Sequence, residues 1–330
     1  MRKFKKFMTR WLPAAIAVAL FTACGEKFRR DEGMVWHTTY HITYKSDRSL
    51  TDSIIATFGA VGNSLNVFDP ASLASRVNEA DSVAVDADFA RVFEMSLRVN
   101  RLTEGAFDPT LGPLITAWGF GRGHKATADT LRLDSLLALT GIGRCRIERG
   151  LMIKGNKGMQ FNFSAIAKGY GCDRVAEMLE RNGVKDYLVE IGGEIRCAGQ
   201  SPSGREWRVS VDRPVFSDSV VHESQCVVSL AGGGPATSGD YRNFHTSGGS
   251  RYGHTISAAT GRPARTDVLS ATVVAPTAME ADALATSMMA MGSRRAKALA
   301  TRLDMPVLLV LADSAVWETP RMKSIVSAIE

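Results

Sequence analysis

The 330-residue sequence lacks the short motifs that identify many enzyme classes. Its five cysteines form no Cys-x-x-Cys pair, which argues against a zinc or thioredoxin-like site. It contains no Walker A loop, GxSxG, HExxH or EF-hand loop, and it has no internal repeat. Beyond the first 24 residues, no apolar run is long enough to span a membrane as a helix. Any chemistry must therefore depend on residues that are dispersed along the chain.

The first 24 residues have the features of a targeting segment. Five positive residues precede an apolar run from Trp11 to Phe21, and Thr22-Ala23-Cys24 follows. The run is about half of the roughly 20 residues that a spanning helix needs, so residues 1–23 are predicted to be a signal peptide. The stretch from Phe21 to Cys24 resembles a bacterial lipobox, which implies that Cys24 is lipidated. Ordinary secretion with an incidental cysteine is the alternative.

These features predict a lipid-anchored protein on the periplasmic side of a bacterial membrane. We expect a signal peptide over 1–23, a polar tether over 24–35 and one large folded domain over 36–330. The excess of 40 Lys and Arg over 34 Asp and Glu gives a net charge of +6, but five of the positive residues lie in the signal peptide. The mature chain is close to neutral, so its charge gives no reason to expect nucleic-acid binding.

Four cysteines follow Cys24, at positions 145, 172, 197 and 226. The expected compartment permits disulfides, but buried free thiols are an equally good interpretation of these positions. The spacing of the four residues does not decide between the two.

Helical and strand periodicities alternate irregularly along the mature chain, without regular βαβ repeats. This order favours an α+β fold over a doubly wound parallel sheet. Strands are expected near 38–44, 187–191, 207–211, 270–275 and 307–311, and helices near 54–65, 88–102, 168–182, 277–292 and 293–302. Gly105, Gly183 and Gly292 stand where helices are expected to end.

The helix expected from residue 277 carries the most informative pair of polar residues. Thr277 and Glu280 have the spacing of a capping box. Asp282 and Thr286 follow at i and i+4, so both side chains project from one face among small and apolar neighbours. A buried Asp is costly unless it is paired or binds a metal, and oxygen ligands favour Mg²⁺ or Ca²⁺. The alternative is that Asp282 interacts with the helix N-terminus and Thr286 only packs.

Three further segments are weaker signals. The strand before Gly192-Gly193-Glu194 ends in paired glycines that allow a ligand to approach the backbone. The small residues before Lys168 open a helix whose free N–H groups could face a phosphate. His254 lies just before a turn, where a histidine is usually a surface residue.

Taken together and in order, these segments resemble the ApbE family, the FAD:protein FMN transferases. The resemblance runs from about residue 38 to 292 and is carried by Thr38-Thr39-Tyr40-His41-Ile42, Phe68-Asp69-Pro70, Ser75-Arg76-Val77-Asn78, Gly105-Ala106-Phe107-Asp108-Pro109-Thr110-Leu111-Gly112-Pro113-Leu114, Trp118-Gly119-Phe120-Gly121, Ile166-Ala167-Lys168-Gly169-Tyr170, Glu190-Ile191-Gly192-Gly193-Glu194, Thr237-Ser238-Gly239-Asp240-Tyr241, His254 and the stretch from Ala275 to Thr286. It implies an ApbE-like α+β fold, related to the T-fold, with mixed sheets packed against helices in a single large domain.

The resemblance also implies the site residues. Mg²⁺, or Ca²⁺, would be held by Asp282, Thr286 and the backbone carbonyl of Ala165. His254 would orient or deprotonate the attacking hydroxyl, and Arg242 would make a secondary phosphate contact. FAD, as co-substrate, would contact Trp36, Phe68, Ala106, Phe107, Asp108, Asn162, Lys168 and Thr255.

The sequence departs from the family pattern at four places. Phe68 replaces a frequent Tyr, Trp36-His37-Thr38 replaces Met-Gly-Thr, Asn162 replaces a common Asp, and Ser257-Ala258 replaces Asp-Pro. These changes bear on how the flavin or the target protein is held. They leave the three implied metal ligands untouched.

The implied reaction transfers FMN from FAD to a Thr or Ser hydroxyl of a target protein, such as a membrane redox subunit, and releases AMP. Three alternatives remain open from the sequence: hydrolysis of FAD to FMN and AMP, a non-catalytic FAD-binding lipoprotein, and a solute-binding lipoprotein without chemistry.

Overall fold

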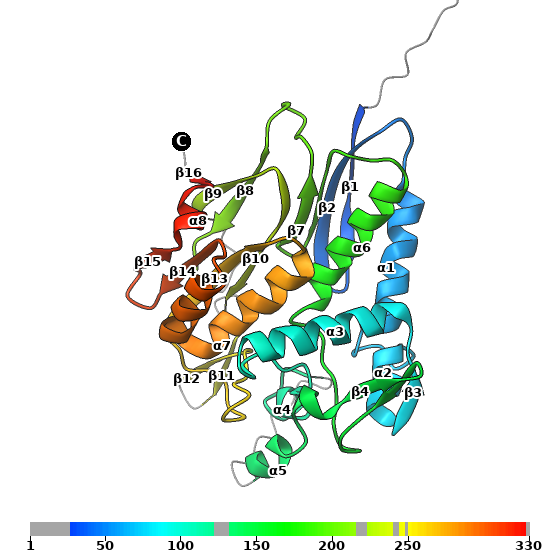
Figure 1. Ribbon diagram of the computed structural model, residues 1–330, viewed down its shortest axis with the longest axis vertical. Helices are drawn as coiled ribbons and strands as arrows, with labels where there is room; N and C mark the ends of the chain where they lie inside the picture. Colours follow the sequence, from blue (N-terminus) through cyan, green and yellow to red (C-terminus); the bar gives the residue numbers. More distant parts are fainter. Residues whose placement is uncertain (1–26, 122–131, 216–222, 240–243, 248–249, 328–330) are drawn as a thin grey trace, which may run out of the picture.

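One antiparallel sheet of eight strands, in the order β1-β2-β6-β7-β10-β13-β14-β15, forms the centre of the molecule (Figure 1). The computed structural model describes residues 27–121, 132–215, 223–239, 244–247 and 250–327. The strands are β1 (Lys27–Val35), β2 (Thr38–Ser46), β6 (Tyr187–Ile191), β7 (Glu194–Ala198), β10 (Gly232–Gly239), β13 (Val268–Ala275), β14 (Val307–Leu311) and β15 (Val316–Glu318). Every neighbouring pair is antiparallel, which confirms the α+β prediction.

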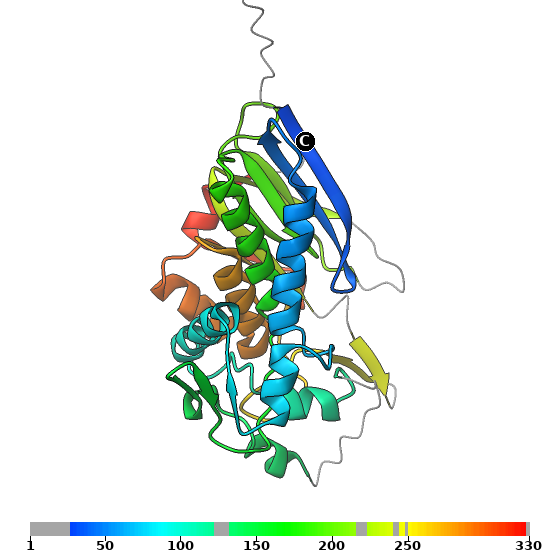
Figure 2. The same ribbon diagram turned by 90° about the vertical axis from the view of Figure 1, so that its right-hand side faces the viewer.

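Helices cover one face of this sheet and a smaller sheet covers the other. The helices α1 (Thr51–Leu65) and α6 (Ala167–Arg181) run alongside β1 and β2 (Figure 2). Ile54 and Val175 of these helices share a buried cluster with Ile42 and Val189 of the sheet. On the opposite face, β8 (Trp207–Asp212), β9 (Ser224–Leu230) and β16 (Val326–Ser327) form the smaller sheet. Trp207 and Val228 of that sheet pack with Leu308.

Helix α7 (Ala278–Arg302) is buried between the large sheet and the other helices. Its first half alternates small residues with Met and Leu, so it can lie close to β10, β13 and α6 on several sides. The long helix α3 (Ala87–Leu102) crosses below it and contributes Phe89 and Phe93 to the same core. Amphipathic spacing correctly predicted α1, α3 and α6, and the capping box at Thr277 correctly predicted the start of α7.

The remaining elements lie below α3 in Figure 1. They are α2 (Leu73–Glu79), β3 (Ser82–Ala84), α4 (Gly112–Ala117), α5 (Leu133–Leu137), the 3₁₀ turn η2 (Ile142–Arg144), β4 (Arg146–Glu148), β5 (Leu151–Ile153), β11 (Phe244–Ser247) and β12 (Ser250–Gly253). The short helix α8 (Pro320–Lys323) packs beside β14 near the end of the chain.

The N-terminal tether prediction is wrong from residue 27 onward. Lys27–Val35 forms strand β1, which pairs along its whole length with β2. Trp36 and His37 close the hairpin with positive φ angles of 47° and 64°, as in a two-residue type I′ turn. The charged sequence of β1 obscured its pairing, because an edge strand keeps one side in solvent and is commonly protected by charge. Cys24 and the predicted signal peptide lie outside the described residues.

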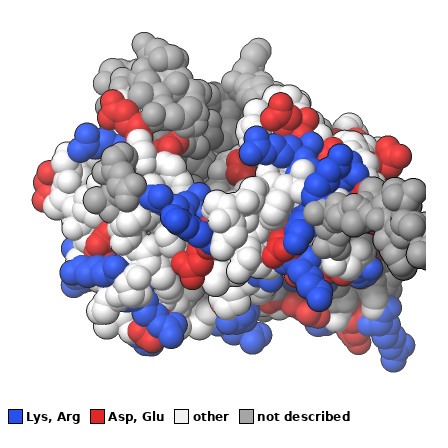
Figure 3. All heavy atoms as spheres, turned by 90° about the horizontal axis from the view of Figure 1, so that it is seen from above, with Lys and Arg blue, Asp and Glu red and all other residues white. Residues whose placement is uncertain are grey.

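The described cysteines are buried free thiols at positions 145, 172, 197 and 226. Charged side chains of both signs are interspersed over the described part of the upper face (Figure 3). Within the described part of the chain, no helix combines the length and apolar character that crossing a membrane requires.

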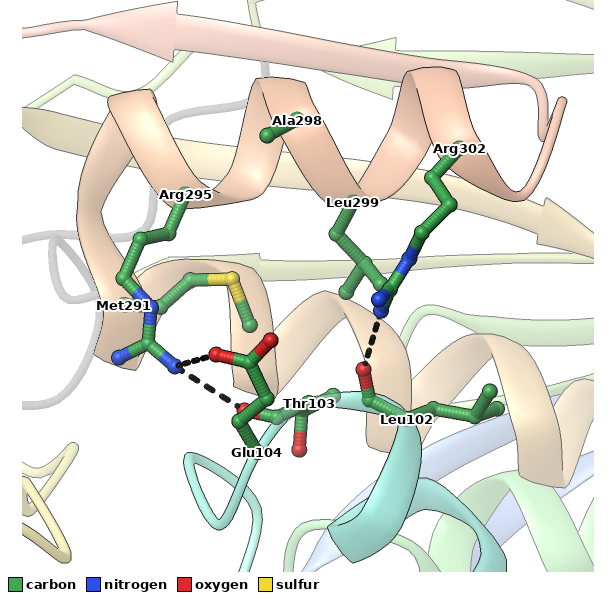
Figure 4. Close-up of a pocket in the computed structure, with 8 residues that line it drawn as sticks. All are labelled: Leu102, Thr103, Glu104, Met291, Arg295, Ala298, Leu299 and Arg302. Atoms are coloured by element: carbon green, nitrogen blue, oxygen red, sulfur yellow. Dashed lines mark hydrogen bonds and ion pairs between the residues drawn. The ribbon is translucent and has the colours of Figure 1, made fainter.

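The predicted helix break at Gly292 is confirmed by a sharp kink. Gly292 has φ 76° and ψ 164°, so α7 consists of two helical halves that meet at this residue. The second half carries Arg295 and Arg302 across a pocket of about 160 Å³ to the end of α3 (Figure 4). Arg302 Nη2 donates to the Leu102 carbonyl at 2.8 Å, and Arg295 Nη2 donates to the Thr103 carbonyl at 3.2 Å. These cations stabilise the exposed carbonyls of a helix C-terminus.

The N-terminal turns of α6 and α7 are joined reciprocally. Asp173 of α6 accepts hydrogen bonds from the backbone N–H groups of Ala278 and Met279, both at 2.9 Å. In return, the Gly169 N–H of α6 donates to Asp282 Oδ2 of α7 at 3.0 Å. A Cβ at position 169 would lie only 2.3 Å from the Ala278 carbonyl oxygen, so only glycine permits this approach.

We therefore expect Gly169→Ala to lower the free energy of unfolding by about 1–3 kcal/mol, since overpacking would separate the two helices. The matched control is Gly59→Ala in α1, where an added Cβ has nothing within 4 Å. That change should raise stability by about 0.5–1 kcal/mol through helix propensity. Urea unfolding of both variants tests this. Equal stability of the two would contradict the close packing at Gly169.

Candidate active site

Asp282 and Thr286 lie one turn apart on α7, as the sequence predicts. Asp282 is buried, with 2% of its surface exposed, and the Gly169 N–H is its hydrogen-bond donor. Thr286 is half-buried, and its Oγ1 lies 3.0 Å from Ser238 Oγ on β10. The helix thus directs a carboxylate and a hydroxyl toward the same region, between α6 and β10.

The carbonyl of Ala165 belongs to the loop that leads into α6. The Tyr170 N–H donates to the Ile166 carbonyl at 3.0 Å, whereas the preceding N–H, of Gly169, is taken by Asp282. Among the described residues, no hydrogen bond ends on the Ala165 carbonyl. The interaction that orients Asp282 therefore also leaves this carbonyl with its acceptor capacity unused.

These three groups fit a hard divalent cation in their chemistry. Carboxylate, hydroxyl and carbonyl oxygens are the ligands that Mg²⁺ and Ca²⁺ prefer, and Mg²⁺ often relies on few protein ligands plus substrate phosphates. No group of three or more His, Cys, Asp or Glu side chains suited to a metal occurs in the described residues. A cation at Asp282 would therefore also rely on the hydroxyl and the carbonyl, with water or a bound ligand completing its coordination.

Lys168, Glu194 and Asp282 form a cluster of three interacting charges, here called the Lys168 cluster. The Lys168 ammonium makes an ion pair with Oε1 of Glu194, a residue that is only 3% exposed. Burial raises the pKa of Glu194 to about 7, although Lys168 acts in the opposite direction. Burial also raises the pKa of Asp282, again opposed by Lys168. Burial would lower the pKa of Lys168, but the two carboxylates outweigh this effect and raise it.

Phe68 and Asn162, two predicted FAD contacts, line one pocket of about 240 Å³. Phe68 is 42% exposed, so part of a large apolar ring reaches the surface at this pocket. The Asn162 Oδ1 accepts the Ser164 N–H at 2.9 Å, which fixes the loop. The other lining residues are Val67, Ser75, Asn78, Glu79, Gly112, Thr116, Gly121, Gln160 and Phe161.

The predicted contacts at 106–108 form a braced loop beside this pocket. Phe107 is buried, and Asn100 Nδ2 donates to its carbonyl at 2.7 Å. Asp108 accepts hydrogen bonds from both the N–H and the hydroxyl of Thr110, at 2.8 and 2.6 Å. Burial raises the pKa of Asp108, while these hydrogen bonds oppose the rise. The side chains of Phe107 and Asp108 thus shape the loop, and Ala106 is half-buried next to them.

Trp36 lies at the other end of the region, in the β1–β2 turn. Its ring centroid is 5.6 Å from that of Phe58, in an edge-on arrangement. A Cβ at Gly171 would lie 2.6 Å from the Trp36 ring, so the ring packs directly on the first turns of α6. Trp36 therefore packs between α1 and α6, near Lys168. Its ring has this packing role in addition to any contact with FAD.

His254 and Thr255 stand on the segment that follows β12. Thr255 is buried, and His254 is half-buried with its ring 6.5 Å from that of Phe120. The Trp118 Nε1 donates to the Gly261 carbonyl at 2.7 Å, which ties this segment to the residues after α4. Gly121, which follows Phe120 in the chain, lines the pocket of Phe68, whereas His254 is not one of the residues that line it. Arg242 lies outside the described residues.

A single stretch from Gln160 to Lys168 connects the two parts of the site. Gln160 and Asn162 line the pocket, Ala165 offers its carbonyl, and Lys168 belongs to the Lys168 cluster. Sequence reasoning did not assign a role to Glu194, Asp173 or Ser238. Glu194 was visible in the Gly192-Gly193-Glu194 motif, but its burial and its partner depend on tertiary structure.

Comparison with known proteins identifies the family and the fold of the chain. The ApbE family matches residues 36–309. The FAD:protein FMN transferase of Vibrio cholerae is 35% identical, covering 92% of this chain and 94% of that protein. The FAD:protein FMN transferase of Escherichia coli K12 is 31% identical, covering 88% and 86%. The solved structure of the flavin transferase ApbE from Vibrio cholerae, 33% identical, superposes with a TM-score of 0.80, covering 91% of this chain and 100% of that one. The apo form of the Pseudomonas stutzeri flavinyl transferase ApbE, 28% identical, gives 0.81 over 92% of this chain and 98% of that one.

Proposed function

Because this chain belongs to the ApbE family and is a flavin transferase, we propose that it transfers FMN from FAD to a Thr or Ser hydroxyl of a target protein with release of AMP. The stretch from Gln160 to Lys168 is the observation that carries this proposal. It joins an open pocket with an exposed aromatic ring to a buried cluster of charge. Such a site suits a ligand that has a flat ring system at one end and a pyrophosphate at the other.

Different residues would contact the flavin ring and the pyrophosphate of FAD. Phe68 offers a face for stacking, and Asn162 lines the same pocket. The loop at 106–108 leads into Pro109, whose carbonyl accepts the Asn162 N–H at 2.6 Å. Lys168 supplies a positive charge for the pyrophosphate. Asp282, Thr286 and the Ala165 carbonyl would hold Mg²⁺, or Ca²⁺, which when bound neutralises charge on the pyrophosphate and aligns it for displacement.

The transfer breaks the phosphoanhydride bond of FAD and forms a phosphoester bond to the target protein. The target hydroxyl oxygen attacks the phosphorus on the FMN side of FAD, and the bond from that phosphorus to the bridging oxygen breaks. AMP leaves with the bridging oxygen, and the hydroxyl proton passes to His254, whose ring contacts Phe120, the neighbour in sequence of the pocket residue Gly121. His254 thus orients the nucleophile and accepts its proton.

We further propose that the protein works at the periplasmic side of a bacterial membrane, lipid-anchored at Cys24. The motif from Phe21 to Cys24 and the preceding charged and apolar segments support this proposal. Its targets would then be redox subunits that are exposed on the same side of the membrane.

The direct test mixes purified protein with FAD, Mg²⁺ and a peptide that carries a flavinylation Thr. Covalently bound flavin together with AMP is the expected result. Free FMN with AMP would instead indicate a hydrolase, and intact bound FAD would indicate a storage protein.

Asp282→Ala should lower metal-dependent transfer by at least about 10²-fold, because the buried carboxylate of the metal site is lost. Asp52→Ala, an exposed change in α1, is the matched control. Near-normal transfer by Asp282→Ala would refute the metal assignment.

His254→Ala should slow transfer by about 10²-fold, the usual effect of losing a general base. FAD affinity, measured by flavin fluorescence, should change little, since the imidazole acts on the nucleophile. An unchanged rate would remove His254 from the mechanism, and a rate loss caused only by weaker FAD binding would reassign it to substrate binding.

Cys24→Ala should release the mature chain from the membrane fraction, because no lipid could be attached. Fractionation of cells that express each form, with immunodetection, measures this. The substitution should leave the transfer rate of the released protein intact. Continued association of the variant with membranes would argue for another means of attachment.

A further inference from the structure

Glu194 occupies an unusual position for a charged side chain. It is the first residue of β7, directly after the Gly192-Gly193 turn, and its side chain is only 4% exposed. One carboxylate oxygen pairs with the Lys168 ammonium. The other, Oε2, is buried and makes no hydrogen bond with any described residue. Burying a carboxylate in this way is unfavourable, so a contribution to folding stability does not account for the presence of this ion pair.

The surroundings of Glu194 fix its carboxylate and its partner. Cys172 Sγ of α6 donates to the Glu194 carbonyl at 3.1 Å, which holds the start of β7 against the helix that carries Lys168. Gly192 has φ 61°, and a Cβ there would lie 3.4 Å from Lys168 Cδ. The turn at Gly192 therefore packs against the aliphatic part of the Lys168 side chain, and the Lys168 ammonium forms its ion pair with Glu194.

Lys168 interacts electrostatically with two buried carboxylates but pairs with only one of them. Glu194 and Asp282 both stabilise the ammonium, and the ion pair is made with Glu194. With all three groups ionised, the Lys168 cluster carries a net charge of −1. Without Glu194 the same cluster would be neutral, and the ammonium would have Asp282 as its only carboxylate partner in the cluster.

We propose that Glu194 is a positioning residue that holds the Lys168 ammonium away from Asp282 and keeps the cluster negative, so that Asp282 can accept a divalent cation. This rests on the proposed function, because it assumes that Asp282 is a metal ligand. Glu194 acts through Lys168 and is not itself a ligand. Its role is to let a lysine and a cation share one site, where the ammonium would otherwise compete for the carboxylate.

The test uses the full mature protein without FAD and measures Mg²⁺ binding by calorimetric titration. Glu194→Gln keeps the shape of the side chain and removes its charge. Mg²⁺ binding should weaken roughly ten-fold or more, the size expected for losing a nearby unit charge at protein-like screening. Glu148→Gln, which makes the same chemical change in an exposed ion pair with Arg146, should leave Mg²⁺ binding unchanged.

The double variant Lys168→Met/Glu194→Gln separates competition from a merely structural effect. It removes both charges, returns the cluster to −1 and leaves no ammonium beside Asp282. Its Mg²⁺ affinity should return to within about three-fold of wild type, although it differs from wild type at two buried positions. If Glu194→Gln alone fails to fold, as judged by thermal unfolding, a folded double variant that binds Mg²⁺ far more weakly than wild type still overturns the proposal.

The outcomes separate this inference from the proposed function. Wild-type protein that binds no Mg²⁺ would refute the metal assignment itself. Wild-type protein that binds Mg²⁺ while Glu194→Gln binds it equally well would overturn only the role of Glu194. A double variant that binds as weakly as Glu194→Gln, or that binds no Mg²⁺, would also overturn it, because removal of the competing ammonium would then have had no effect.

Discussion

The contact between the first turns of α6 and α7 is the constraint on which the rest of the site depends. Each helix supplies an aspartate to the other: Asp173 accepts the first N–H groups of α7, and Asp282 accepts the Gly169 N–H. These bonds satisfy backbone donors that a helix N-terminus otherwise leaves unpaired. The same contact leaves the Ala165 carbonyl available and sets Lys168 near Asp282. The close packing of α6 against α7 thus also determines how the candidate metal ligands are arranged.

The pocket side of the site is built on a different principle. Its walls come from segments far apart in the sequence, and backbone hydrogen bonds hold them together. Asn162 N donates to the Pro109 carbonyl at 2.6 Å, and Gly112 N donates to the Gln160 carbonyl at 3.2 Å. A Cβ at Gly112 would lie 2.5 Å from the Gln160 carbonyl oxygen, so the two segments touch backbone to backbone. Loops braced in this way can present Phe68 and Asn162 in fixed positions.

Local features of the sequence predicted what depends on local structure. The spacing of Asp282 and Thr286 determined their common face, and Gly292 marked the break in α7, because helix geometry and glycine conformation are short-range properties. Thr277 caps α7 through the Glu280 N–H as expected, but the Glu280 carboxylate pairs with Arg98 at 2.8 Å. The burial of Glu194 depends on Lys168 and Cys172, 26 and 22 residues away along the chain, and the packing of Trp36 depends on Gly171, 135 residues away, so no local pattern could reveal them. Strand β1 was missed because its partner, and not its own charged sequence, makes it a strand.

A lipid on Cys24 would make strand β1 a determinant of how far the active site stands from the bilayer. If Cys24 carries the lipid, two residues separate it from Lys27, and the three Cα–Cα steps between them reach at most about 11 Å. From there the nine residues of β1 extend about 30 Å to the turn at Trp36, which packs near Lys168. The strand would act as a rigid spacer between the bilayer and the active site, in place of the polar tether that the sequence predicts over 24–35. A hydroxyl that receives FMN would have to lie at the same distance from the lipid surface as the active site. The length of β1 would therefore select targets by the position of their hydroxyl relative to the membrane as well as by sequence.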